Sequence, residues 1–94
     1  MYLGKRIKEL REQREVLQRQ LAASLEIDTP MFSKIERGER RAKREQVLKL
    51  AELLNADPNE LLTLWLSDQI TELVKDEDNA DRALNLVMRN LRNL

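Results

Sequence analysis

The sequence predicts an all-α fold, and its composition, its periodicity and the position of its polar runs each support this. Three aromatics and few β-branched clusters occur among 94 residues, whereas Leu, Ala, Glu, Lys, Arg and Gln dominate. Apolar residues recur at intervals of three and four, which is typical of helices that bury one face. Polar runs at residues 36–45 and 75–81 interrupt this pattern. We expect a five-helix domain over residues 1–66 and, over residues 67–94, an extension with an additional amphipathic helix.

The first two helices are predicted from apolar spacing. Leu3, Ile7 and Leu10 share one face of a helix over about residues 3–15. A shorter helix follows, with an apolar face made of Leu17, Leu21, Ala22 and Leu25. Glu15 and Glu26 stand in the connections on either side of it, where a positive φ is often needed. Each is expected to cost about 1 kcal/mol relative to Gly.

A third helix begins after a tight turn. Asp28 or Thr29 can cap it, and Pro30 suits its first turn, because an N–H group missing there costs nothing. Gly38 supplies its end. Its inward face is formed by Phe32 and Ile35, with Ile27 from the turn. Its outward face carries Thr29, Pro30, Ser33, Lys34 and Arg37.

The outward face of the third helix continues into a basic segment. Between Lys34 and Arg44 the chain carries six cations against two anions, a net charge of +4 that attracts phosphates. The whole chain is balanced at 17 basic and 17 acidic residues, because residues 49–94 carry −4. A solvated helix face is the simpler interpretation of the outward residues, but the adjacent basic segment favours two short helices that read DNA.

The remaining helices carry more apolar surface than one small domain needs. The fourth helix ends near Asn55 after an apolar face made of Val47, Leu48, Leu50, Ala51 and Leu54. The fifth runs over about residues 58–75, with Asp57 as cap and Pro58 in its first turn. Its residues Leu61, Leu62 and Trp65 are expected to complete the core. Its other apolar residues, Leu66, Ile70 and Leu73, then need a second partner.

The last segment can cover that surface. An apolar seam recurs at intervals of four and three through Ala80, Leu84, Val87, Leu91 and Leu94. We predict a separate helix capped by Asp78, although one long helix interrupted at Glu77 is also compatible with the spacing. The seam can fold back on its own domain or form a dimer interface, for which the expected residues are Leu66, Ile70, Leu73, Leu84, Val87 and Leu91.

Composition excludes several classes of protein. The chain has no Cys, so disulfides and thiolate metal sites are excluded and a reducing cytoplasm fits. It has no His, the commonest general base and metal ligand. We therefore expect no enzymatic activity, no metal and no cofactor. Neither a membrane span nor a secretion signal is expected, because no apolar run is long enough.

The residues described above resemble the Cro/C1-type, or Xre-type, helix-turn-helix regulators of bacteria and phages. The resemblance covers about Leu3 to Leu62. Its most specific piece is SKIERGER, residues 33–40, and LKLAELLNADPNELL, residues 48–62, is similar to the family's fourth and fifth helices. The sequence departs from the family pattern at Glu26, where the family has a turn Gly, at Ala42, where it has Pro, and at Lys43, where it has a capping Ser.

The resemblance implies a role for each matching residue. Gln18 would begin the second helix against a phosphate. Base edges in the major groove would be contacted by Thr29, Pro30, Ser33 and Lys34. The backbone or the edge of the minor groove would be held by Arg37, Arg40, Arg41, Lys43 and Arg44. Arg11 and Glu36 would form a structural ion pair without a role in reading sequence.

The sequence therefore predicts a DNA-binding transcriptional regulator, a repressor, that binds double-stranded DNA at a two-fold-related operator as a homodimer. The alternative is an antitoxin-like or other protein-interaction module, whose C-terminal helices bind a co-encoded partner protein.

Overall fold

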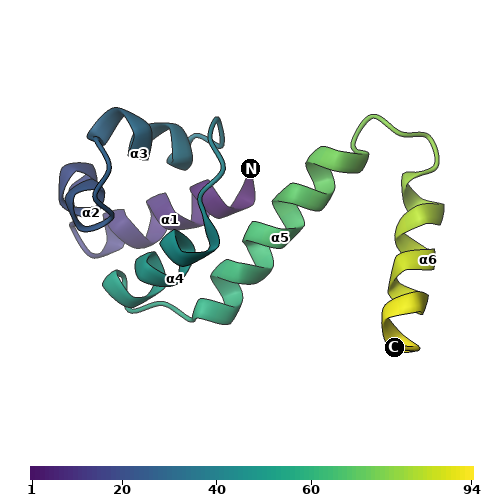
Figure 1. The fold of residues 1–94 in the computed structure, drawn as a ribbon. Coiled ribbons are helices and arrows are strands. Elements are labelled where there is room, and N and C mark those ends of the chain that lie inside the picture. The colour runs from purple at the N-terminus through teal and green to yellow at the C-terminus, as the bar shows by residue number, and fades with distance from the viewer.

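The computed structural model describes all 94 residues and contains six α-helices and no strand, so the all-α prediction is confirmed. The helices are α1 (Tyr2–Gln13), α2 (Gln18–Ser24), α3 (Thr29–Glu36), α4 (Arg44–Leu53), α5 (Pro58–Val74) and α6 (Ala80–Arg92). Helices α1 to α4 and the first part of α5 form one globular unit, while α6 stands apart beyond the far end of α5 (Figure 1). No helix combines the length and the apolar character that crossing a bilayer requires.

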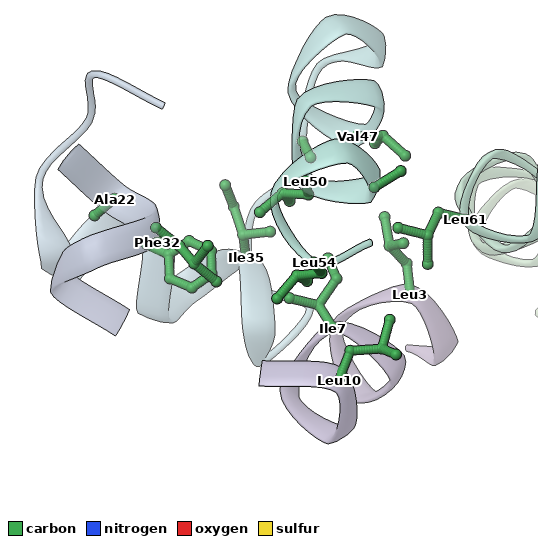
Figure 2. Packing of buried hydrophobic residues seen from close by; sticks show 13 residues of the cluster. Leu3, Ile7, Leu10, Ala22, Phe32, Ile35, Val47, Leu50, Leu54 and Leu61 are labelled. Atoms are coloured by element: carbon green, nitrogen blue, oxygen red, sulfur yellow. The ribbon is translucent and has the colours of Figure 1, made fainter. Parts of the chain in front are cut away.

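The core lies where helices α1 to α5 meet, and consists of 13 buried apolar residues (Figure 2). Its largest fully buried side chains are Phe32, Ile7, Leu50, Leu54, Leu61 and Val47. Phe32 lies beside Ala22 at the α2–α3 end, and Leu61 enters from α5 (Figure 2). Leu62 and Trp65 pack against this cluster while partly buried. The prediction that Leu61, Leu62 and Trp65 complete the core is therefore confirmed.

Local signals set most helix ends as predicted. Asp28 caps α3 by accepting a hydrogen bond from the Met31 N–H at 2.7 Å, and Asp57 caps α5 by accepting one from Asn59. The backbone has positive φ at Glu15 (55°) and at Glu26 (60°), in the two connections where positive φ was expected. Further positive values occur at Asn55 and Gly38.

Other predicted boundaries were wrong by a few residues. Helix α1 ends at Gln13, because the chain turns at Arg14 before the left-handed Glu15. Helix α4 begins at Arg44, inside the polar run that was expected to interrupt structure. Helix α6 is capped at Asn79 and not at Asp78, and it lacks a side-chain cap bond. A turn at residues 75–79 separates α5 from α6, so the single long helix does not form.

A glycine permits the close crossing of α1 and α3. A Cβ atom added at Gly4 would stand 2.3 Å from the carbonyl oxygen of Glu36 and 2.8 Å from that of Ile35. Both neighbours are backbone atoms, so a side chain at this position forces the two helices apart. Gly4 thus sets how close α3 lies to the rest of the domain.

Candidate nucleic-acid interface

The α2–α3 pair presents one polar face of α3 to solvent. Phe32 and Ile35 are buried below it, as their spacing predicted. On the opposite side Thr29, Pro30 and Lys34 are exposed. The Lys34 ammonium forms neither an ion pair nor a hydrogen bond within the chain. It is therefore free to donate to an external acceptor.

The basic segment continues from α3 through the α3–α4 loop into α4. We use this name for Lys34, Arg37, Arg40, Arg41, Lys43 and Arg44, which are all exposed. Arg37 forms an ion pair with Glu39, whereas no acidic side chain of this protein pairs with the other five. Five unpaired cations within eleven residues of chain create a site for anions.

The N-terminus of α4 adds to this attraction. Arg44 is the first residue of α4, and the Lys43 N–H donates a hydrogen bond to Gln46 Oε1 at 2.8 Å. Gln46 thus satisfies the N–H of the cap residue itself, whereas Lys43, which stands where the family pattern has Ser, offers no side-chain acceptor to the first free N–H groups of α4. The partial positive charge of the helix N-terminus coincides with the two cations, an arrangement that suits phosphate.

Two predicted contact residues are tied to each other. Nη1 of Arg37 donates a hydrogen bond to Ser33 Oγ at 2.7 Å, and Nε of Arg37 contacts the Glu39 carboxylate. The Ser33 hydroxyl proton remains available, because its oxygen acts as the acceptor here. These bonds fix the direction of both side chains on the outer face of α3.

A buried polar network joins α1, α2 and α3 behind this face. Arg11 Nε and Nη2 donate to the two carboxylate oxygens of Glu36 at 2.6 and 3.2 Å. Gln18 Nε2 donates to Glu36 Oε1 at 2.9 Å, and Arg11 Nη1 donates to the Val16 carbonyl. The Glu36 side chain is only 3% exposed. Its charge is matched by one guanidinium and its oxygens are satisfied by three donors, which is what burying a carboxylate requires.

The network also affects protonation. The hydrogen bond from Arg11 to Glu36, strengthened by the negative charge of that carboxylate, raises the pKa of Arg11 above its ordinary value. A group whose pKa is raised on folding contributes stability at every pH below its unfolded pKa. For a guanidinium this covers the whole physiological range, and the contribution of the raised Arg11 pKa is lost as the pH rises into strong base.

This network changes the expected role of Gln18. The side chain that was predicted to lie against a phosphate is half-buried and donates to Glu36. The sequence indicated the pair of Arg11 with Glu36 but not the hydrogen bond from Gln18 to Glu36. A Gln at the start of a helix can equally well point into solvent, so its identity alone does not indicate a buried partner. Because the side chain is bound to Glu36, the group of Gln18 that can contact a phosphate is its backbone N–H at the N-terminus of α2.

Helix α5 is tied by polar contacts to the α3–α4 loop and to the start of α1. Trp65 Nε1 donates to the carbonyl of Ala42, in the middle of the α3–α4 loop, at 2.7 Å. The buried Asp68 accepts hydrogen bonds from the N–H groups of Tyr2 and Leu3 at 3.0 and 2.9 Å. Asp68 therefore caps α1 from a distant helix, and the packing of the first domain extends beyond residue 66.

The residues predicted for a dimer interface are left uncovered within one chain. Leu66, Ile70 and Leu73 are exposed on α5, and Val87 and Leu91 are exposed on α6. Leu84 is half-buried. No residue of α6 is buried. The single chain therefore leaves two apolar stripes in solvent, one on α5 and one on α6.

A short helix pair with a free polar face, followed by unpaired cations and supported by a buried core, defines a helix-turn-helix DNA-binding protein. The model of a helix-turn-helix domain family matches residues 2–64. The chain belongs to this helix-turn-helix family. No curated protein and no solved structure gives a significant match.

Proposed function

We propose that this protein is an Xre-type, Cro/C1-like transcriptional repressor that binds a two-fold-related operator as a homodimer and catalyses no reaction. The observation that carries the proposal is the outer face of α3 with its unpaired Lys34, which continues into four further unpaired cations in the α3–α4 loop and at the start of α4. The face offers donors to base edges, and the cations offer contacts to phosphates.

The proposed contacts divide by chemistry. Lys34 reads a guanine, because an ammonium is a donor only and guanine presents two acceptors in the major groove. Thr29, Pro30 and Ser33 lie beside it on α3 and contact neighbouring bases. The positions proposed to hold the sugar-phosphate backbone are Arg37, Arg40, Arg41, Lys43 and Arg44.

A dimer is proposed because one short reading helix spans few base pairs. Two half-sites about one helical turn apart supply the affinity and the specificity that one lacks. The uncovered stripes of α5 and α6 are the surfaces available for this association.

The direct experiment measures binding of the purified chain to the DNA upstream of its own gene, at two salt concentrations and against a scrambled competitor. We expect discrimination in favour of the upstream DNA, and affinity that falls steeply with salt. Equal binding to both DNAs contradicts an operator-specific repressor. The variant Leu84→Glu with Leu91→Glu should be monomeric by light scattering and should bind the full operator far more weakly, since each half-site then binds independently.

A second candidate is an antitoxin-like module that captures a co-encoded protein. The observation in its favour is α6, an amphipathic helix with no partner in the chain. Tight capture of a co-encoded protein by α6, with no preference for the upstream DNA, would favour this candidate over the repressor.

A further inference from the structure

The charge of the C-terminal region is distributed unevenly between its two helices. Residues 66–79 carry five acidic side chains and one Lys, a net charge of −4, while residues 80–94 carry three Arg and one Asp, a net charge of +2. Within the C-terminal region the negative charge is thus concentrated in the second half of α5 and the turn, and α6 is a basic helix.

Part of this charge is already satisfied within the chain. Asp68 caps α1, and Glu72 pairs with Lys75 at 3.1 Å. The remaining acids are the three consecutive residues 76–78, which we call the acidic turn. No cation of the same chain pairs with them, and none of the three arginines of α6, Arg82, Arg89 and Arg92, has an acidic partner.

We propose that α6 packs on the α5 helix of a second copy of this chain, with its C-terminal arginines beside that copy's acidic turn. The proposal rests on the homodimer proposed above and specifies how it is built. Leu66, Ile70 and Leu73 are spaced by four and three residues, and so are Ala80, Leu84 and Val87. When the two helices run in the same direction, these stripes match and Val87 lies level with residue 73 of the partner. Arg89 and Arg92 then extend past the end of the partner's α5, where its acidic turn begins.

Two other arrangements would also cover the stripes, but they bring fewer opposite charges together. In a fold-back within one chain, α6 starts at its own acidic turn. Arg89 then lies about 13 Å from that turn along the helix axis, away from the acidic residues. In a pairing of α6 with α6 of the second copy, two helices of charge +2 lie together and repel. Pairing α6 with the partner's α5 places opposite charges together on both sides of the two-fold axis.

The arrangement also accounts for the open shape of the C-terminal region. After the turn at residues 75–79, α6 diverges from α5 and does not close onto it (Figure 1). Two such open hairpins can interlock, so that each α6 lies on the other chain's α5. The four helices then bury four stripes in one bundle, with packing typical of four-helix bundles.

Two charge-reversal variants of the full chain test this arrangement. The first is Arg89→Glu with Arg92→Glu, and the second is Asp76→Lys with Glu77→Lys. Each variant alone places like charges together at both α6–α5 contacts, so its dimer should dissociate at a concentration about tenfold higher or more at low salt. An equimolar mixture restores opposite charges at both contacts, and should form a mixed dimer about as strong as the wild type.

The dissociation constants are measured by analytical ultracentrifugation, and mixed dimers by native mass spectrometry. Circular dichroism checks that each variant keeps its helical content. The matched control is Lys5→Glu with Lys8→Glu, which reverses two exposed charges on α1 and should leave the dimer unchanged.

The outcomes separate the alternatives. Weak dimers for both variants and a strong mixed dimer support the proposal. A wild-type dimer that the Asp76→Lys, Glu77→Lys variant leaves intact overturns it, and leaves the homodimer of the proposed function standing. A monomeric wild type at tens of micromolar overturns both.

Discussion

The buried pair between Arg11 and Glu36 gives the sharpest prediction for stability. Replacing Arg11 with Met removes the guanidinium and leaves the Glu36 carboxylate, only 3% exposed, with Gln18 as its one side-chain donor. Removing one partner of a buried ion pair costs about 3–5 kcal/mol. This is a large part of the roughly 5–15 kcal/mol by which a domain is usually stable.

The measurement is urea unfolding, followed by circular dichroism and by the fluorescence of Trp65, the single tryptophan. With a slope of about 1.5 kcal/mol per molar urea, Arg11→Met should lower the midpoint by roughly 2–3 M. Arg11→Lys keeps the charge but loses the two-pronged geometry, and should cost about 1–2 kcal/mol.

A second substitution separates the ion pair from simple packing. In the double variant Arg11→Met with Glu36→Met no unpaired charge is buried, so it should be more stable than Arg11→Met alone. If Arg11→Met costs less than about 1 kcal/mol, or if the double variant is the less stable of the two, the reasoning is refuted. Arg11→Lys should bind the same DNA motif as the wild type, because the pair lies behind the reading face.

Three further predictions concern other parts of the domain. Arg41→Ala or Arg44→Ala should weaken binding to all DNA sequences alike and reduce the salt slope by about one unit, and a changed motif with an intact slope would contradict the phosphate role. Lys34→Ala should lose roughly 1–3 kcal/mol at one base pair per half-site, so a selection from randomised operators that returns the wild-type motif would reject the assignment. Gly4→Ala should lower the urea midpoint although Ala favours helices, because its Cβ would stand 2.3 Å from the Glu36 carbonyl, and an unchanged or higher midpoint would show that the helices separate easily.

The sequence by itself determined the features that depend on neighbouring residues. Helix α3 is capped by Asp28 and α5 by Asp57, because a carboxylate before a helix reaches its first free N–H groups. Apolar spacing identified the inward faces, including Phe32 and Ile35, since a helix repeats every 3.6 residues. The basic segment was also visible, because its six cations lie within eleven residues of the chain.

Only the tertiary structure decided which distant groups meet. From the sequence, Asp68 would be expected to be a solvated acid on a helix. In the structure it accepts a hydrogen bond from the N–H of Leu3, which lies 65 residues away in the chain. The sequence predicts Trp65 as a core residue, and the structure shows that its indole N–H also donates a hydrogen bond to the carbonyl of Ala42. Such contacts depend on how α5 crosses α1 and the α3–α4 loop, and that crossing is set by packing in the whole core. Periodicity along the chain reports which face of a helix is buried, but it does not carry the angle at which two helices cross or the polar groups that the crossing brings together.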